Sequence, residues 1–236
     1  MARGTIHIDN VSKTFWIKGR PHTVLNGVNL TVPPRTGVAL LGRNGAGKST
    51  LLSMIAGALA PDSGRIVTDG SVSWPVGFSG SFHRDMTGAQ NTRFVARVYG
   101  VDTEALSDFV EGFAELGEHY HLPIRSYSSG MRSRLSFGVS MGIAFDTYLI
   151  DEVTSVGDAA FKTKSNALLK DRLQDSGAIM VSHSMAKLRR ICTKGAVIEN
   201  GQLWWYENID DAIAHHQANM KRRSGHDIDD EDIDDD

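Results

Sequence analysis

The sequence predicts a single α/β domain in which helices cover a mostly parallel sheet. Strand and helix patterns alternate from residue 147 to residue 192, which is typical of such sheets. A glycine-rich turn also separates an apolar strand from an amphipathic helix near residues 42–49. With 41% hydrophobic and 22% charged residues in a chain of 236, the composition is that of a globular protein. One domain with a substantial core is therefore expected.

The N-terminal part should contain five short strands and one helix. Alternating apolar residues indicate strands, and the residues Pro61 to Gly64 have the composition of a turn. In the helix, Leu51, Leu52 and Ile55 recur at the spacing of one buried face. The predicted strands span residues 5–11, 24–32, 36–41, 64–69 and 72–76, and the helix spans residues 49–58.

The middle of the chain should be helical, and the remainder should return to alternating strands and helices. Asn200-Gly201 between two apolar runs is the strongest short signal for a hairpin. The predicted helices span residues 88–99, 104–117, 129–144, 158–175, 184–192 and 209–220. The predicted strands span residues 147–150, 178–182, 196–199 and 202–206.

Acidic and basic residues are unevenly distributed along the chain. The net charge is −3, but residues 227–236 hold eight acids; without them 25 basic residues face 20 acidic ones, a net charge of +5. We expect residues 1–223 to form the domain and residues 224–236 to form an acidic, disordered tail. No apolar run is long enough to cross a bilayer, no secretory signal is expected at the start, and the single cysteine, Cys192, fits a reducing cytoplasm.

The glycine-rich turn matches a phosphate-binding loop, because its residues satisfy G-x-x-x-x-G-K-S between a predicted strand and a predicted helix. In such loops backbone amides and the helix N-terminus surround phosphate oxygens, while the lysine reaches the β- and γ-phosphates. The alternative is a turn that only caps a helix. The predicted nucleotide-binding residues are Gly42, Arg43, Asn44, Gly45, Ala46, Gly47, Lys48, Ser49 and Thr50.

Carboxylates at the end of a later apolar strand predict a magnesium-dependent phosphoryl transfer site. Asp151 is placed to hold Mg²⁺ together with Ser49, and Glu152 to polarise the attacking water. His183 ends a strand 32 residues after Asp151 and could contact the γ-phosphate. With Lys48, we predict that Glu152 and His183 form the catalytic group. Taken alone, the acids could cap a helix and the histidine could be a surface residue.

A serine-glycine segment before residue 132 distinguishes between kinds of P-loop protein. Ser128-Ser129-Gly130-Met131 opens an apolar helix 21 residues before Asp151. On its own this segment is more often a simple helix cap. The order of phosphate loop, serine-glycine segment, Asp-Glu pair and histidine resembles the ATP-binding subunits of ABC transporters over nearly the whole chain.

The resemblance implies a P-loop NTPase fold, the ABC ATPase cassette, with a mixed sheet core, an antiparallel β edge and a helical signature subdomain at about residues 86–145. It also implies a head-to-tail homodimer in which Ser128, Ser129, Gly130 and Met131 close on ATP held by the other subunit. Ser155, Val156, Gly157 and Asp158 match the D-loop of the family. Phe15 matches the aromatic residue that stacks on adenine.

The sequences of segments 73–78, 86–88, 127–138 and 151–158 are similar to motifs of capsular polysaccharide export ATP-binding proteins of Gram-negative bacteria. Related subunits export O-antigen or teichoic acid, and the absence of an added C-terminal carbohydrate-binding domain favours capsule. The resemblance implies ATP and Mg²⁺ as cofactors and a separate integral membrane permease as partner. It implies a peripheral position on the cytoplasmic face of the inner membrane. The polysaccharide would be handled mainly by the permease and other export proteins.

One departure from the family pattern concerns a glutamine that usually contacts Mg²⁺ after the strand at residues 72–77. This chain has no glutamine there before Gln90, and we align His83 with that role as a third metal ligand. A soluble ABC-type ATPase acting on nucleic acid is a rival function. It usually has tandem cassettes or coiled-coil insertions, so no nucleic-acid partner is expected. A GTPase would carry N-K-x-D, which the sequence lacks.

Overall fold

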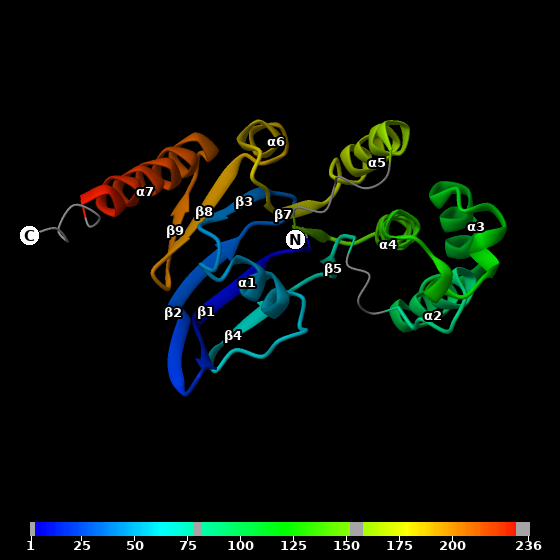
Figure 1. The fold of residues 1–236 in the computed structure, drawn as a ribbon, viewed down its shortest axis with the longest axis horizontal. Helices are drawn as coiled ribbons and strands as arrows, with labels where there is room; N and C mark the ends of the chain where they lie inside the picture. Colours follow the sequence, from blue (N-terminus) through cyan, green and yellow to red (C-terminus); the bar gives the residue numbers. More distant parts are fainter. Residues whose placement is uncertain (1–2, 78–81, 152–157, 230–236) are drawn as a thin grey trace, which may run out of the picture.

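The computed structural model describes residues 3–77, 82–151 and 158–229, with side chains described to residue 221. Two sheets form the framework (Figure 1). The larger has the order β5-β6-β7-β3-β8-β9 and is parallel apart from β9, and the smaller is antiparallel with the order β2-β1-β4. Their strands are β1 (Ile6–Ile17), β2 (Arg20–Val32), β3 (Gly37–Gly42), β4 (Ser63–Thr68), β5 (Val72–Pro75), β6 (Thr147–Asp151), β7 (Gly177–Val181), β8 (Lys194–Glu199) and β9 (Gln202–Tyr206). This confirms the predicted α/β class with a mixed sheet.

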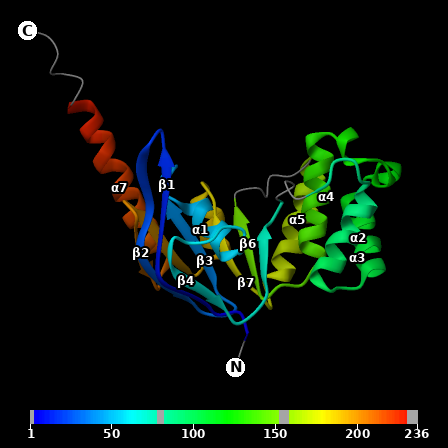
Figure 2. The ribbon, with the colours of Figure 1, turned by 90° about the horizontal axis from the view of Figure 1, so that it is seen from below.

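The helices lie on the faces of the large sheet and in a separate lobe. Figure 2 shows α2, α3 and α4 gathered on one side of the molecule, away from the antiparallel sheet, with α5 beside them. The helices are α1 (Lys48–Ile55), α2 (Gly88–Tyr99), α3 (Thr103–Ala114), α4 (Ser129–Gly142), α5 (Ala159–Arg172), α6 (Met185–Ile191) and α7 (Ile209–Asp229). Two short 3₁₀ turns, η1 (Gly117–His121) and η2 (Ile124–Ser126), precede α4. Within the described residues no helix combines the length and the apolar character needed to cross a membrane.

Two apolar cores hold the layers together. One fills the space between the two sheets and includes the buried face of α1, where Leu51 and Leu52 are 1% and 0% exposed. The other joins the opposite face of the large sheet to the helical lobe, with Tyr148 on β6 and Phe137 on α4 both fully buried. Strand β3 is buried by both cores, because successive side chains of a strand point to opposite faces.

Side-chain caps determine where several helices begin. Thr87 and Gln90 form a capping box at α2, and Ser128 accepts a hydrogen bond from the Met131 amide at the start of α4. Asp158 caps α5 in the same way. Since caps of this kind are local, the predicted start at residue 129 is confirmed and the one at residue 158 lies within one residue of the observed start.

The largest difference from the prediction is in the first two strands. Both continue toward each other and form one long hairpin, closed by Lys18 at φ 49° and Gly19 at φ 76°. Three register shifts between Ile8 and Thr14 interrupt the alternation of apolar residues, so the pattern predicted only the regular ends. Helix α7 is also longer than predicted and enters the segment expected to be a tail, of which residues 230–236 lie outside the described residues.

Candidate functional site

The phosphate-binding loop joins β3 to α1 and is shaped by glycines in the left-handed region. Gly45 has φ 80° and Gly47 has φ 103°, conformations that other residues adopt only with strain. A Cβ at Gly47 would also lie 3.1 Å from the carbonyl oxygen of Val24. Because Gly47 has no side chain to cap α1, the amides of the first helical turn are not engaged by a capping group. These features create a concave surface of backbone amides.

Lys48 lies across this loop. Its Nζ donates hydrogen bonds to the carbonyl oxygens of Gly42 at 2.7 Å and Arg43 at 2.8 Å. The ammonium group therefore lies beside the amides of the loop, where it can neutralise a bound anion.

A cavity of about 250 Å³ lies in front of the loop and brings together residues far apart in the sequence. Asp151 and His183 reach it from the carboxyl ends of β6 and β7, where parallel sheets place their ligands. The Ser49 hydroxyl donates a hydrogen bond of 3.0 Å to Asp151 Oδ2. The lining residues are Asn44, Gly45, Gly47, Lys48, Ser49, Thr50, Asp151, Val181 and His183.

The oxygens of Ser49 and Asp151 fit a magnesium ion. Both are hard oxygen donors, they are 3.0 Å apart, and they lie beside Lys48 and the loop amides. Among the described residues there is no cluster of three His, Cys, Asp or Glu side chains that could hold a metal ion by itself. Magnesium usually takes one or two protein ligands and completes its shell with phosphate and water, so this pair is sufficient.

A second cavity, of about 320 Å³, adjoins the first, and the sequence did not predict it. Asn44 and Gly45 line both cavities, and His22 on β2 and His216 on α7 line the second one. Burial, reinforced by the nearby charge of Lys48, lowers the pKa of His216 below its ordinary value, so its ring is neutral at pH 7. The amphipathic pattern of residues 209–220 predicted a helix but held no signal that this helix would reach the loop.

Phe15 is adjacent to this second cavity without lining it. Its backbone pairs with His22, and its ring packs against the core between the sheets. Lys13 Nζ lies 5.7 Å from the ring centroid. The structure thus places Phe15 on the same hairpin as His22, and its role in stacking on adenine stays a prediction.

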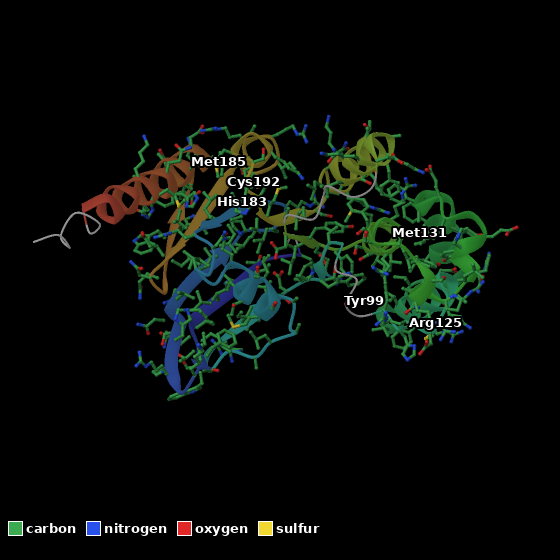
Figure 3. All side chains as sticks on the ribbon, viewed as in Figure 1. Tyr99, Arg125, Met131, His183, Met185 and Cys192 are labelled. Atoms are coloured by element: carbon green, nitrogen blue, oxygen red, sulfur yellow. The ribbon has the colours of Figure 1, made fainter. Side chains whose placement is uncertain are left out.

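The serine-glycine segment has a cavity of its own, of about 430 Å³. Ser128 Oγ accepts a hydrogen bond of 3.2 Å from the Met131 amide, so this serine does cap the helix. The cavity is lined by Glu115, Leu116, His119, Ser128, Gly130, Met131, Arg134 and Asp158. It shares no lining residue with the two cavities around the phosphate-binding loop. Figure 3 shows Met131 in the helical lobe and His183 beside the large sheet, well apart.

Arg134 ties the start of α5 to this cavity. Its guanidinium lies 2.7 Å from Asp158 Oδ2 and 3.8 Å from Glu115 Oε2. The hydrogen bond from the Phe161 amide, with the charge of Arg134, lowers the pKa of Asp158 below its ordinary value. Asp158 is the described part of the predicted D-loop. Glu152, Ser155, Val156 and Gly157 lie outside the described residues, so the roles assigned to them stay predictions.

Comparison with known proteins shows to which family the chain belongs. The family model described as ABC transporter matches residues 25–155, more than half of the chain. The chain belongs to the ABC transporter family. The cassette is 47% identical over 211 residues to the polysialic acid transport ATP-binding protein KpsT of Escherichia coli, which covers 88% of this chain and 94% of the relative. It is 39% identical over 213 residues to the capsule polysaccharide export ATP-binding protein CtrD of Neisseria meningitidis, covering 90% and 99% of the two chains.

A solved structure shares the fold of the cassette. The dimeric ATP-binding cassette MJ0796, in a post-hydrolysis state bound to ADP and Pi, superposes with a TM-score of 0.72 and 18% sequence identity, covering 86% of this chain and 98% of that one. At this identity the likeness concerns the fold alone.

His83, the predicted third metal ligand, does not line a cavity with Ser49 and Asp151. It is exposed, and its Nδ1 accepts a hydrogen bond of 3.3 Å from the Asp85 amide. Neither cavity lined by Ser49 and Asp151 includes it. Residues 78–81, just before it, lie outside the described residues, so its role as a magnesium ligand stays a prediction.

Proposed function

We propose that this chain binds and hydrolyses ATP and thereby drives the export of capsular polysaccharide through a separate membrane permease. The observation that carries the proposal is the cavity where Lys48, Ser49, Asp151 and His183 meet around the phosphate-binding loop. The substrate class rests on the relatives KpsT and CtrD, whose names describe polysialic acid transport and capsule polysaccharide export.

In this proposal the protein mainly positions the triphosphate and neutralises its charge. The loop amides and Lys48 bind the β- and γ-phosphates, and Ser49 with Asp151 holds Mg²⁺, which offsets negative charge on the same oxygens. Glu152 follows Asp151 directly and accepts the proton of the attacking water, and His183 donates to the γ-phosphate from the end of β7.

A second copy of the chain completes the site. Ser128 and Gly130 line a cavity that shares no residue with the phosphate-binding cavity, so one copy does not bring both halves together. We infer a head-to-tail dimer in which Ser129 and Gly130 of one copy contact the γ-phosphate held by the other. The exposed hydroxyl of Ser129 and the backbone amides at the start of α4 suit an anionic ligand.

An apolar groove of about 550 Å³ between α1, β5 and α2 is the surface we assign to the permease. Phe94, Val98 and Tyr99 line it and are 57%, 62% and 43% exposed, which is unusual for large apolar side chains. Ser49 and Asp151 line the same groove. A segment of the permease bound there would contact the proposed magnesium ligands and sense whether nucleotide is present. We accordingly place the chain on the cytoplasmic face of the inner membrane.

The chemical part of the proposal is tested with two variants. Glu152→Gln should bind ATP with near-normal affinity and lose turnover, because the amide cannot accept a proton from water. Lys48→Ala should lose most of the nucleotide affinity as well. Both are measured by nucleotide titration and phosphate release in the presence of Mg²⁺. Normal turnover by Glu152→Gln would remove Glu152 from its role.

The transport part is tested by complementation. The gene for this chain is expressed in capsulated cells of Escherichia coli that lack KpsT but keep their own permease, and surface polysaccharide is measured with a capsule-specific antibody. Restored surface polysaccharide with the native chain, and none with Glu152→Gln, supports the proposal. Normal ATP hydrolysis by the purified chain without restored export would leave the ATPase role intact and overturn the substrate class.

A further inference from the structure

The end of the β1–β2 hairpin projects beyond the body of the protein. Residues 16–23 are all exposed, whereas the flanking Val24 is 7% exposed. At about 3.3 Å per residue, the four exposed residues from Thr23 back to Arg20 place the turn about 13 Å past the buried Val24. Figures 1 and 2 both show this hairpin extending past β4 at one end of the antiparallel sheet.

The tip carries large apolar side chains that nothing covers. Trp16 is 74% exposed and Ile17 is 55% exposed, the first being the highest value among the exposed large hydrophobic residues described. Phe15 points into the core, so the side chain of Trp16, its neighbour on the strand, points to the opposite face of the sheet. A nucleotide that contacted Phe15 on the core side of the sheet would therefore leave the side chain of Trp16 exposed.

The tip is a regular turn, so these side chains are presented in a defined way. Lys18 and Gly19 both have positive φ, as in a two-residue type I′ turn, and Ile17 pairs with Arg20 across it. Trp16 pairs with Pro21 in the next position.

The surroundings of the tip are positively charged. The sequence has no Asp or Glu between Asp9 and Asp62. Those two acids are engaged by Arg65 and Lys13 respectively. Among the described residues no acid lies within ion-pair distance of Lys18 or Arg20, which flank the turn. Two basic side chains and two exposed apolar ones thus share a tip, and neither basic group forms an ion pair with a described acid.

The hairpin tip and helix α2 lie toward the same edge of the molecule. In Figure 1 the hairpin end and α2 are at the lower edge, while α5 and α6 are at the upper edge. Helix α2 carries Phe94, Val98 and Tyr99, and β4, also at that edge, carries Val67, which is 47% exposed.

We propose that the β1–β2 hairpin tip is a membrane contact that binds anionic phospholipid. Tryptophan is suited to the interface because its ring is amphipathic, and Lys18 and Arg20 are positioned to pair with phosphate headgroups. Such an anchor would hold the cassette against the bilayer on the side where α2 faces its partner. It goes beyond the proposed function, and the test needs neither the permease nor ATP hydrolysis.

The test is co-sedimentation of the purified full-length chain with lipid vesicles. Vesicles of phosphatidylcholine alone are compared with vesicles that contain phosphatidylglycerol as well. The native chain should bind the anionic vesicles at least about tenfold more tightly, since each basic residue near an anionic surface contributes to the attraction. Binding should fall when the ionic strength is raised to about 1 M, where the Debye length is about 3 Å.

Two variants and two matched controls assign the binding to the tip. Lys18→Glu with Arg20→Glu, and separately Trp16→Ser with Ile17→Ser, should each weaken binding to anionic vesicles at least about tenfold. The charge control is Lys170→Glu with Arg190→Glu, which makes the same change in net charge on α5 and α6. The apolar control is Met220→Ser on α7, a 46% exposed side chain on a helix away from that edge. Both controls should bind as the native chain does, and circular dichroism checks that all variants are folded.

Three outcomes would overturn the proposal: no binding of the native chain to anionic vesicles, equal binding to both kinds of vesicle, or equal loss in the controls. A fourth concerns a second copy of the chain as occupant. If the tip variants prevent ATP-dependent dimerisation of Glu152→Gln in size-exclusion chromatography but still bind vesicles, the tip is a dimer contact instead. Failure of the lipid test leaves the ATPase measurements untouched, so the two proposals fail separately.

Discussion

Asn91 on α2 should be among the polar side chains on which the stability of the cassette depends most. It is 2% exposed. Its Oδ1 accepts a hydrogen bond of 2.8 Å from the His83 amide, and its Nδ2 is directed at the carbonyl oxygens of His83, Met86 and Thr87 at 3.1, 3.3 and 2.9 Å. A single amide thus ties the segment before α2 to the helix.

The size of the effect of Asn91→Ala follows from these contacts. The amide has two hydrogens, so two of the three carbonyls can receive a full hydrogen bond, and the bond from His83 makes three. At about 1 kcal/mol for each, the loss is about 3 kcal/mol of the free energy of unfolding. The partly buried His83 amide is also left without its partner, which places the expected loss at the upper end of the range for single substitutions.

Urea unfolding followed by far-UV circular dichroism measures this loss as a lower midpoint at an unchanged slope. The control is Gln90→Ala, one residue earlier on the same helix. Gln90 is exposed, and its side chain accepts one capping hydrogen bond of 2.9 Å from the Thr87 amide. Its removal should therefore lower the free energy of unfolding by at most about 1 kcal/mol. If the two variants lose the same stability, the buried amide is not the tie inferred here.

Asn91→Asp sharpens the test because it keeps the shape and the acceptor but replaces the donors with an oxygen. That oxygen would face three carbonyl oxygens, so the charged form is disfavoured and the pKa of the new carboxyl should rise in the folded state. A raised pKa means that the folded state binds more protons than the unfolded state above about pH 4, so the penalty grows as the pH rises. Asn91→Asp should therefore lose more stability at pH 7 than at pH 4 relative to the native chain. A penalty that does not change with pH would contradict this.

Three further substitutions or reactions have defined outcomes. Ser73→Ala should cost about 1–3 kcal/mol in urea unfolding, because the fully buried Ser73 hydroxyl accepts the Leu149 amide at 2.9 Å and no other partner would replace it; an unchanged midpoint would refute this. Gly47→Ala should weaken ATP binding by about tenfold or more in a fluorescent-nucleotide titration, since φ 103° and a Cβ 3.1 Å from the Val24 oxygen would distort the loop; native affinity would show that the loop tolerates a side chain. Burial raises the pKa of the Cys192 thiol to about 12, so at pH 8 iodoacetamide should modify it slowly in the folded chain and quickly in urea, and rapid labelling of the folded chain would contradict its burial.

The extent of the elements was predictable where local signals agree. Thr87 and Gln90 form a capping box, and Gly100 ends α2 at φ 66°, so residues 88–99 match the predicted helix at both ends. Asn200 and Gly201 likewise closed the predicted β8–β9 hairpin. The hairpin of β1 and β2 was not predicted at its tip, because bulges break the alternation on which the prediction rests.

The phosphate-binding loop and Asp151 could be placed from the sequence because both follow strands of one parallel sheet, and the carboxyl ends of such strands meet at one edge. The approach of α7 to that loop could not be predicted, since it depends on how a helix packs across β8 and β3. His22 and His216 are separated by nearly the whole chain, and no local pattern relates them.

The sequence by itself determined the kinds of element, most of their bounds and the residues that bear phosphate chemistry, because caps, turns and hydrophobic period act over a few neighbouring residues. Tertiary structure decided which of these residues share a cavity, that the serine-glycine segment of one chain lies apart from its phosphate-binding loop, and that Trp16 projects into solvent. These outcomes depend on the pairing of strands more than 100 residues apart and on the packing of whole layers, so they follow from the free energy of the entire fold and from no single segment.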